Sequence, residues 1–458
     1  MESLATVVLA AGKGTRMKSG LIKVLHPVAG VPMIAWPVAA TREAGSGTIV
    51  LVIGHQASAV QGVFRGAADI RCVMQEDQLG TGHAVGCALE ALNGFRGTVL
   101  ILCGDTPLLR SETLKSMLTF HQGNQAAVTV LTALMDEPYG YGRVVRDASG
   151  RVTRIVEQKD ADPEEQEIRE INSGIYCMDS DFLFANIRGI GNDNAQGEYY
   201  LTDLLAIAVR KGLTCLALPT ADADEIMGVN DRVQLADAGR ILRRRINRDH
   251  MLNGVTIIDP DNTYIDQGVT IGADTTIHPG CQIGGGTVIG SGCEIDQSVS
   301  ITGCRIGDDC HIKAASVLED SELADDVAVG PMAHLRPGST LGNRVKIGNF
   351  VETKKIVMGE GSKASHLTYL GDAEIGRNVN IGCGTITCNY DGVNKHRTVI
   401  ADDVFIGSDV QLVAPVSVGR NSLVAAGTTV TIDVPPDSLA LSRVPQINKE
   451  GWRLKKKP

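Results

Sequence analysis

An aliphatic side chain returns at every sixth position over most of the second half of this 458-residue chain. The first unbroken run comprises Ile265, Ile271, Ile277, Ile283, Ile289, Ile295 and Ile301, and after a five-residue step the same spacing resumes at Ile306. A period of six matches neither an α-helix nor a strand, and it is typical of a parallel β-helix. We therefore predict a hexapeptide-repeat solenoid over residues 252–458, with one aliphatic side chain per hexad pointing inward.

The repeat is interrupted twice, at residues 348–374 and around residues 389–397. Interruptions of a solenoid are usually surface loops, and loops on a rigid scaffold often carry function, so we expect a loop at each place. His366 lies in the first interruption, near Lys354 and Tyr369 in the sequence. Cations there would suit a phosphate, and a neutral imidazole beside them would suit proton abstraction from an amine.

The first half of the chain, residues 1–230, alternates short apolar runs with amphipathic stretches. Strands buried on both faces are expected at 5–10, 48–54 and 97–105, and two of the helices at 32–45 and 83–94. This alternation predicts an α/β domain of Rossmann-like type. Residues 231–251 carry apolar side chains at helical spacing among charges, which predicts one connecting helix. The chain after Val434 loses the repeat and is expected to form a tail.

The first expected strand runs into the turn LAAGKGTRM, residues 9–17. Glycines let backbone N–H groups approach an anion closely, so the turn favours a phosphate ligand. It lacks the spacing of a P-loop, and a methionine stands where the dinucleotide-binding fingerprint needs its third glycine, which excludes both motifs. In LCGDTPLL, Asp105 follows a buried strand at the edge where open α/β sheets bind ligands. A carboxylate there is well placed to hold Mg²⁺ against phosphates.

Four segments together, LAAGKGTRM, KVLH, QLGTGHA and LCGDTPLL, resemble the sugar-nucleotide pyrophosphorylases, and YGYGRVV, IVEQKDA, EINSGIY and MGVNDRVQLA continue the resemblance in order. Such enzymes join a nucleoside triphosphate to a sugar 1-phosphate and release pyrophosphate. The resemblance implies that Arg16 and Lys23 act on the triphosphate and that Asp105 and Asn230 bind Mg²⁺. It also implies that UTP and the UDP-sugar contact Leu9, Ala10, Ala11, Gly12, Lys23, Gln75, Gly80, Thr81, Cys103, Gly104, Asp105, Gly142, Glu157, Asn172 and Asn230.

The solenoid blocks GSKASHLTYLGDAEIG and GTITCNYDG resemble a bacterial family of bifunctional N-acetylglucosamine-1-phosphate uridylyltransferase/glucosamine-1-phosphate N-acetyltransferases, and the resemblance runs from about residue 5 to Trp452. It implies a left-handed β-helix, a homotrimer, and acetyl-CoA bound between neighbouring subunits. It makes His366 the general base of acetyl transfer. The sugar phosphate would contact Arg336, Lys354, Tyr369 and Asn380, and acetyl-CoA would contact Cys383, Asn389, Tyr390, Ser408, Ala426 and Arg443. The implied end product is UDP-N-acetylglucosamine, a precursor of bacterial peptidoglycan and lipopolysaccharide.

Three positions depart from the pattern of these families. Ile22 stands where proline usually precedes the lysine of KVLH, and Cys103 stands where an aromatic residue is frequent. Both changes leave every charged group in place. Cys383 replaces a common alanine, which is tolerated if only the backbone of that residue takes part, and nothing in the sequence marks its thiol as activated. We expect all three to adjust the sites without changing their chemistry.

Composition excludes several other classes of protein. A formal net charge of −10 and a pI near 5.5 argue against a nucleic-acid partner. The amino-terminal stretch MESLATVVLAAGKG lacks the basic and apolar regions of a signal peptide, and no apolar run approaches the roughly 20 residues of a membrane-spanning helix. We therefore expect no membrane insertion and a cytoplasmic location. None of the 11 cysteines forms a CxxC pair, and we expect free thiols.

Two other interpretations of the second half remain open on sequence alone. The β-helix could regulate a single-activity pyrophosphorylase, or it could be purely a trimerisation scaffold without affinity for acetyl-CoA; both predict no acetyl transfer. A metal-dependent solenoid enzyme is disfavoured. His278, His311 and His334 stand at unrelated hexad positions without the spacing of metal ligands.

Overall fold

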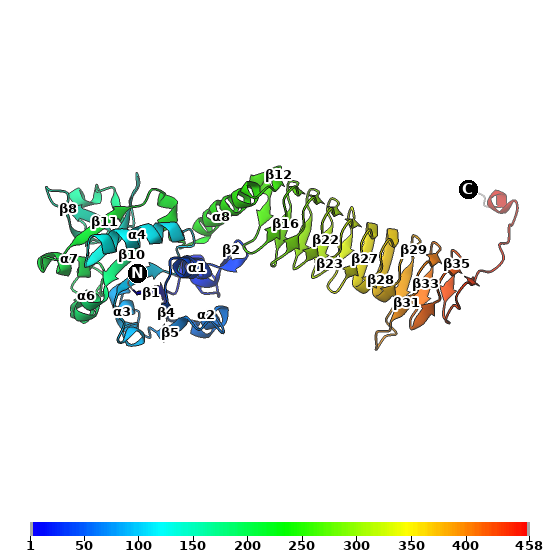
Figure 1. Cartoon of the computed structure of the whole chain (residues 1–458), viewed down its shortest axis with the longest axis horizontal. Helices are drawn as coiled ribbons and strands as arrows, with labels where there is room; N and C mark the ends of the chain where they lie inside the picture. Colours follow the sequence, from blue (N-terminus) through cyan, green and yellow to red (C-terminus); the bar gives the residue numbers. More distant parts are fainter. Residues whose placement is uncertain (1–2, 456–458) are drawn as a thin grey trace. The chain divides into compact units, whose positions relative to one another are not determined.

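The structure is a computed structural model that describes residues 3–455 and divides into two compact units, Met1–Leu242 and Arg243–Pro458. Figure 1 shows helices around a sheet in the first unit and a stack of short strands in the second. The predicted connecting helix is confirmed as α8, Arg232–Leu252. The tail begins later than expected, because β37, Leu439–Ala440, still pairs with β35 of the solenoid. It includes the 3₁₀ turn η7, Trp452–Lys455, and its last three residues lie outside the described part. None of the described helices is both long and apolar enough to span a bilayer.

The first unit is built on a nine-stranded sheet. Seven of its strands follow the order β11-β7-β10-β6-β1-β4-β5, and the other two lie off this path, with β8 paired to β10 and β9 paired to β8. Neighbouring side chains of β1 enter different cores: Val7 packs in a cluster with Leu183, and Val8 in one with Val38. Both faces of the sheet are therefore covered, which explains the continuous apolar runs. The strands expected at 5–10, 48–54 and 97–105 are confirmed as β1, β4 and β6.

The elements of the first unit have the following bounds. The strands are β1 Leu4–Ala10, β2 Pro27–Val28, β3 Val31–Pro32, β4 Thr48–Ile53, β5 Ile70–Met74, β6 Thr98–Cys103, β7 Val128–Leu134, β8 Arg143–Arg146, β9 Val152–Val156, β10 Glu170–Asp179 and β11 Cys215–Pro219. The helices are α1 Ala35–Glu43, α2 Ala57–Val63, α3 Thr81–Cys87, α4 Ser111–Gly123, α5 Pro163–Gln166, α6 Ser180–Asn186 and α7 Asp203–Arg210. Short 3₁₀ turns are η1 Thr15–Met17, η2 Lys23–Leu25, η3 Glu90–Leu92, η4 Ile187–Gly189 and η5 Ala223–Ile226. The helix expected at 83–94 is thus split between α3 and η3.

The second unit is a parallel β-helix in which most strands pair with the strand three places later, while the long strands β27 and β28 each pair with several neighbours. Tyr264 pairs with Gln282 and Ile265 with Ile283, so one coil consists of three hexads. The aliphatic side chain of each hexad points into a single core that runs from Val255 to Val434. The three flat faces of the coil are named here by one strand each, as the β24 face, the β25 face and the β26 face.

The strands of the second unit have the following bounds. They are β12 Thr256–Ile257, β13 Tyr264–Ile265, β14 Thr270–Ile271, β15 Thr276–Ile277, β16 Gln282–Gly284, β17 Val288–Ile289, β18 Glu294–Ile295, β19 Ser300–Thr302, β20 Arg305–Ile306, β21 His311–Ile312, β22 Val317–Glu319, β23 Glu322–Leu323, β24 Ala328–Val329, β25 His334–Leu335, β26 Thr340–Leu341, β27 Lys346–Met358, β28 Lys363–Ile375, β29 Asn380–Ile381, β30 Ile386–Cys388, β31 Thr398–Ile400, β32 Phe405–Ile406, β33 Gln411–Val413, β34 Val416–Val418, β35 Leu423–Val424, β36 Thr429–Val430 and β37 Leu439–Ala440. A 3₁₀ turn, η6 Pro260–Asn262, lies near the start.

The expectation of a loop at residues 348–374 is wrong. The segment forms most of β27 and β28, which pair in parallel from Lys346 to Met358. The inward position of each hexad is still filled, but by less uniform side chains, namely the fully buried Thr353, Met358, Ala364 and Leu370. The repeat is therefore hidden in the sequence rather than broken, and His366 stands on a regular coil.

The second interruption is confirmed as a loop, because residues 389–397 join β30 to β31 without forming a strand. The expectation for the cysteines is also confirmed, since all eleven are free. Cys281, Cys293 and Cys310 are buried in the solenoid core.

Gly348→Ala is expected to destabilise the second unit by about 2 kcal/mol or more. A Cβ atom at this position would overlap the carbonyl oxygen of Ser365 and lie 2.5 Å from its carbonyl carbon. Those atoms belong to the backbone of the next coil, so no side-chain rotation relieves the clash. Thermal unfolding measures the effect, with Gly239→Ala, which has nothing within 4 Å, as the control. An unchanged midpoint for Gly348→Ala would contradict the close packing of these coils.

Candidate active sites

The turn after β1 and the end of β6 meet at one edge of the first sheet. β1 pairs in parallel with β6, with Leu9 opposite Cys103. The amide of Gly104 donates to the carbonyl oxygen of Leu9 at 2.9 Å, and a Cβ on Gly104 would lie 3.1 Å from that oxygen. Glycine at position 104 therefore lets the chain just before Asp105 approach the backbone of Leu9 closely. This approach lies at the carboxyl edge, where such sheets bind ligands.

A cluster of charged and polar side chains lies at this edge. The Lys23 ammonium forms an ion pair with Asp105 and donates to Oδ1 of Asn230 at 3.0 Å. Nη2 of Arg16 donates to the same Asn230 oxygen at 2.9 Å. The Lys23 and Asp105 side chains are only 13% and 20% exposed. Four residues that are distant in the sequence thus form one partly buried polar cluster.

Local backbone features hold this cluster in place. Gly14 has φ of 62°, and a Cβ there would lie 2.5 Å from Cβ of Lys23, so the turn packs directly onto the lysine. The amide of Val229 donates to the carbonyl oxygen of Asp105 at 2.9 Å, which fixes the segment that carries Asn230. The Asn230 amide donates to Oε1 of Gln234 at 2.7 Å.

The predicted uridine-binding residues continue along the same edge. Gln75 follows β5, and its Nε2 donates to the carbonyl oxygen of Gly80 at 3.2 Å. Thr81 begins α3, where its hydroxyl accepts from the amide of Leu201 at 3.1 Å. Gln78, which sequence reasoning missed, donates to the carbonyl oxygen of Ala11 at 2.6 Å. It joins the QLGTGHA segment to the glycine-rich turn.

Three of the predicted UDP-sugar residues lie around β8, β9 and β10: Gly142 directly precedes β8, Glu157 directly follows β9, and Asn172 is part of β10. The amide of Asn172 donates to the carbonyl oxygen of Gly142 at 2.9 Å, and Asn172 Oδ1 accepts from the hydroxyl of Tyr176 at 2.8 Å. A Cβ at Gly142 would lie 3.4 Å from the Glu157 carboxylate, so the glycine leaves that carboxylate accessible. Burial, followed by the charge of Asp160, raises the pKa of Glu157.

The thiol of Cys103 lies beside this group, near the backbone of Gly174. Burial and the neighbouring Asp105 carboxylate raise its pKa to about 12. The thiol is therefore neutral near pH 7 and acts as a small apolar side chain. It offers no nucleophile to the site.

On the solenoid, His366 stands at the corner between the β24 face and the β25 face. It pairs in register with Asn349 of the preceding coil. Its Nδ1 lies 2.9 Å from Oδ1 of Asn349. An amide oxygen only accepts, so this contact favours the tautomer of the neutral ring in which Nδ1 carries the proton and Nε2 keeps a free lone pair. Asn349 was missed in the sequence, although it stands one full coil before His366.

The predicted acetyl-CoA residues continue down the same corner. By the strand register, Cys383, Ser408 and Ala426 follow His366 in successive coils. Backbone bonds join them, since Asp409 donates to the carbonyl oxygen of Cys383 at 2.7 Å and Gly427 to that of Ser408 at 2.9 Å. Arg443 completes the row, with its Cδ 3.9 Å from where a Gly427 Cβ would stand.

The predicted sugar-phosphate residues gather at the other end of the β25 face. Arg336 and Lys354 stand in register, and the side chains of Tyr369 and Asn389 both reach over Gly371. Lys395, also missed, lies beside Lys354 and, as the largest cause, lowers its pKa. Neighbouring ammonium groups of this kind suit a phosphate.

Three residues do not lie in the group to which they were predicted to belong. Asn380 lies on the β24 face, paired with Lys363. Asn389 and Tyr390 lie at or after β30, away from the corner row of the other acetyl-CoA residues; Asn389 donates to Asp372 at 2.5 Å. Within one chain the predicted acetyl-CoA residues are therefore divided between two corners of the coil.

The expectation for the solenoid histidines is wrong in one respect. His278 and His311, at positions that looked unrelated, both contact the carboxylate of Glu294, at 3.5 Å and 3.8 Å. His334 is separate and pairs with Glu319 at 3.0 Å. The stacking of successive coils brings together side chains whose positions within their hexads give no sign of a contact.

The fold and the two sites define a nucleotidyltransferase unit joined to a hexapeptide-repeat unit. Comparison with known families agrees. Residues 6–163 match the MobA-like NTP transferase domain, residues 248–353 match the left-handed β-helix (LbH) domain of the EIF2B epsilon subunit, and residues 397–431 match the bacterial transferase hexapeptide of six repeats.

Full-length relatives narrow the class to one family. The "Bifunctional protein GlmU" of Pelobacter propionicus is 71% identical, covering 100% of this chain and 99% of the relative. Proteins of the same name from Geotalea uraniireducens and Geobacter sulfurreducens are 65% and 64% identical, with full coverage of both chains. The chain belongs to the bifunctional GlmU family. It is a bifunctional enzyme, an N-acetylglucosamine-1-phosphate uridylyltransferase and a glucosamine-1-phosphate N-acetyltransferase.

Proposed function

We propose that the Arg16–Lys23–Asp105–Asn230 cluster carries out uridylyl transfer and that the His366 corner of the solenoid carries out acetyl transfer. The observation that carries this assignment is that each unit contains groups suited to one of the two reactions. One set places two cations and a carboxylate at the sheet edge, and the other places an oriented imidazole at one corner of the β25 face and a pair of ammonium groups toward its other end. Acetylation comes first, and its product is the substrate of the first unit.

Uridylyl transfer needs positioning and charge neutralisation rather than a protein base. A phosphate oxygen of N-acetylglucosamine 1-phosphate is already an anion, and it attacks the α-phosphorus of UTP while pyrophosphate leaves. Lys23 and Arg16 offset the negative charge that gathers on the phosphates. Gly142, Glu157 and Asn172 hold the sugar, and the turn from Leu9 to Gly12 with Gln75 holds the uridine, so that the reactants are aligned in line.

Mg²⁺ fits the oxygen atoms of this cluster. Asp105 Oδ2 and Asn230 Oδ1 converge on one cationic nitrogen, that of Lys23, so the two oxygens are close enough to share a metal ion. One carboxylate, one amide oxygen and the substrate phosphates are a usual ligand set for Mg²⁺. When bound there, the ion supplies charge neutralisation on the phosphates.

Acetyl transfer uses the oriented imidazole of His366. Nε2 accepts a proton from the 2-amino group of glucosamine 1-phosphate as the nitrogen attacks the carbonyl carbon of acetyl-CoA. The C–S bond then breaks, and coenzyme A leaves as a thiolate that takes up a proton. Lys354 and Arg336 hold the sugar phosphate, and backbone N–H groups near Cys383 and Ser408 stabilise the developing oxyanion.

A homotrimer would complete the acetyl-transfer site. The acetyl-CoA residues stand at two corners of one coil, and a neighbouring chain can bring one corner against the other. Apolar side chains also stack beside His366: Met332, Phe350 and Leu367 follow one another in three coils and are 48%, 53% and 60% exposed. An adjacent chain covering these side chains would remove them from water. Because the substrates UTP and acetyl-CoA are intracellular metabolites, we place the enzyme in the cytoplasm.

One preparation of the wild-type chain tests the assignment. With glucosamine 1-phosphate, acetyl-CoA, UTP and Mg²⁺, both free thiol and pyrophosphate are expected, and sedimentation is expected to give the mass of three chains. Phe350→Glu is expected to weaken the trimer and acetyl transfer together. Pyrophosphate without thiol would leave the solenoid as a regulator or scaffold. A fully active monomer would contradict the shared site.

A further inference from the structure

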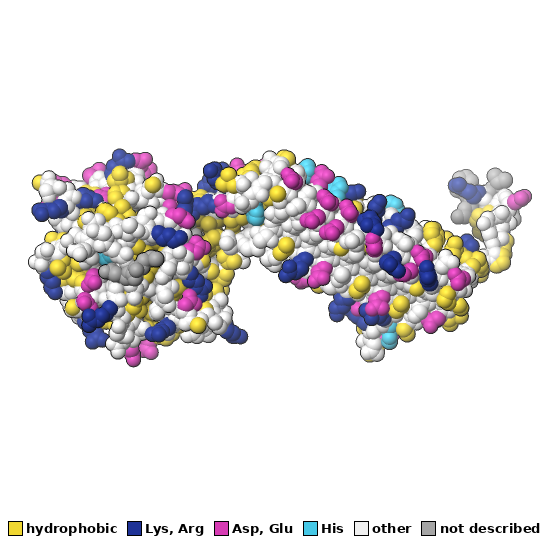
Figure 2. Space-filling view, in the orientation of Figure 1, with side chains coloured by type: hydrophobic (Ala, Val, Ile, Leu, Met, Phe, Trp, Pro, Cys, Tyr) yellow, Lys and Arg dark blue, Asp and Glu magenta, His cyan; other side chains and the backbone are white. Residues whose placement is uncertain are grey.

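A second group of chemically reactive side chains lies on the solenoid, away from both sites. It comprises His278, Glu294, Asp296 and His311, which project from three consecutive coils at and just after β15, β18 and β21. In Figure 2, histidine and acidic side chains lie together on the exposed surface of the solenoid. The group, named here the His₂–acid group, stands three coils before His366 by the strand register. Neither proposed reaction uses it.

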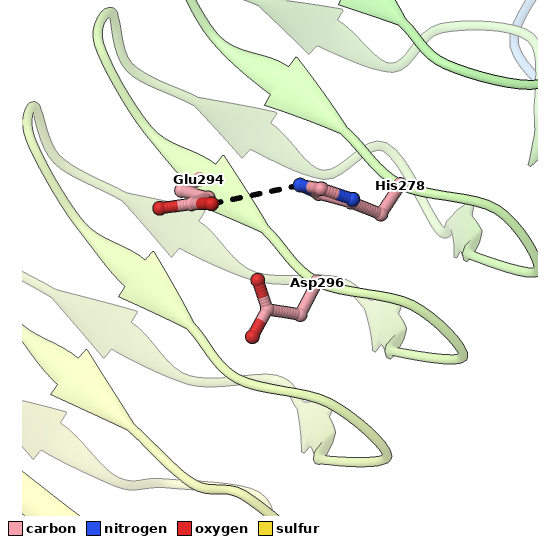
Figure 3. A group of neighbouring side chains, drawn as sticks. All are labelled: His278, Glu294 and Asp296. Carbon is pink, nitrogen blue, oxygen red and sulfur yellow. Dashed lines mark ion pairs between the residues drawn. The ribbon is translucent and has the colours of Figure 1, made fainter.

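Three of the four side chains converge on a small volume, and His311 reaches the two carboxylates among them. Nε2 of His278 lies 3.5 Å from Glu294 Oε1, and Nε2 of His311 lies 3.2 Å from Asp296 Oδ1. His311 also lies 3.8 Å from Glu294 Oε2. Donor atoms of His278, Glu294 and Asp296 all lie within 4.8 Å of one another, and Figure 3 shows His278 and Glu294 pointing toward each other above Asp296.

These separations suit a tetrahedral metal ion. With metal–ligand bonds of about 2.0–2.2 Å, neighbouring ligand atoms lie roughly 3.3–3.6 Å apart. The three imidazole–carboxylate separations bracket that range. His311, Glu294 and Asp296 all lie at the solvent face, and rotation of their side chains would bring the remaining ligand atoms together.

The backbone makes the arrangement rigid. His278 donates its amide to the carbonyl oxygen of Ile295 at 2.9 Å, and Asp296 donates to that of Ile312 at 2.9 Å. The side chains therefore start from fixed positions on a packed scaffold, which lowers the cost of ordering them around an ion. The His334–Glu319 pair has the same residue types but one imidazole and one carboxylate, and it serves as the natural comparison.

We propose that the His₂–acid group binds one divalent transition-metal ion of the Zn²⁺ and Co²⁺ class. Two imidazoles and two carboxylates favour these ions, whereas Mg²⁺ prefers an all-oxygen set. The ion would join three consecutive coils through side chains, in addition to their backbone ladder. Its role is structural: a ligand that binds only the folded form raises stability by mass action.

Visible absorption of Co²⁺ tests the proposal on the full chain, without a histidine tag. Excess Mg²⁺ is present to fill the Asp105 site. Tetrahedral Co²⁺ absorbs far more strongly than octahedral Co²⁺, and thiolate ligands would add charge-transfer bands that this group cannot give. We expect one tetrahedral ion per chain without those bands. His278→Gln and His311→Gln should each weaken binding at least about 10-fold, and His334→Gln should leave it unchanged.

Thermal unfolding gives an independent measurement. Zn²⁺ is expected to raise the unfolding midpoint of the wild type and of His334→Gln, but not of the His278→Gln/His311→Gln double variant. Glu294→Gln, at an exposed side chain, is the further variant if the double variant folds poorly, and it should also weaken Co²⁺ binding. A wild type without the tetrahedral band would overturn the proposal, as would a band that survives in the double variant.

Discussion

His366→Ala is expected to lower the rate of acetyl transfer by a factor on the order of 10² to 10⁴, while uridylyl transfer stays at the wild-type rate. The size follows from the usual contribution of a positioned general base. The imidazole is the group whose Nε2 is left free by the 2.9 Å hydrogen bond from Nδ1 to Asn349. Free thiol from acetyl-CoA measures the first reaction. Pyrophosphate released when N-acetylglucosamine 1-phosphate is supplied measures the second.

Asn349→Ala is the matched variant for this test. It leaves the imidazole in place and removes only the acceptor that orients it, so acetyl transfer should fall less, about 10-fold. The loss should lie in kcat rather than in KM for glucosamine 1-phosphate. A wild-type rate of thiol release from His366→Ala would remove the histidine from the mechanism. An equal loss of both products would point to misfolding instead.

Asp105→Ala is expected to have the reverse effect. Uridylyl transfer should fall by a factor on the order of 10² to 10³, comparable to the loss of one electrostatic contact in a transition state. The variant removes the carboxylate that would hold Mg²⁺ and leaves the Lys23 ammonium without its ion-pair partner. Acetyl transfer should be unchanged, because the His366 corner belongs to the other unit.

Two controls sharpen the Asp105 experiment. Asp69→Ala removes an aspartate that pairs with Arg42 at the surface, and it should leave both activities intact. Asp105→Asn keeps an oxygen of the same reach but loses the charge, so its rate should lie between those of the wild type and Asp105→Ala. Unchanged pyrophosphate release from Asp105→Ala would contradict the proposed site.

The solenoid was predictable from the sequence because each hexad places one side chain in the core, and that constraint produces a six-residue spacing of aliphatic residues. This spacing could not be recognised where Thr353 and Ala364 take the inward position, which is why a loop was expected there. Both residues are buried as fully as the isoleucines. Burial, not residue type, is what the coil requires at those positions.

In the first unit, the place of Asp105 and of the glycine-rich turn was predictable because strand ends of a parallel sheet meet at one edge, whereas Arg16, Lys23 and Asn230 were expected only from the resemblance to a family. Asn349, Lys395 and the His₂–acid group were not found, because their neighbours lie one or two coils away. The length of a coil also varies: Ile356 pairs with Ala373, but Ala373 pairs with Thr398, because the second loop is inserted between β30 and β31. Contacts across a coil therefore have no constant sequence spacing and need the register of the strands.

The corner row from His366 through Cys383, Ser408 and Ala426 to Arg443 has a further consequence. Parallel strands stack about 4.8 Å apart, so four coil steps separate the imidazole from the guanidinium by roughly 19 Å. A ligand with its reacting carbon at one end and an anion at the other must be extended over that length to reach both. With the roles proposed for His366 and Arg443, the number of coils between the two residues would set the length of the acyl carrier that the enzyme accepts, and inserting one coil would lengthen it by about 5 Å.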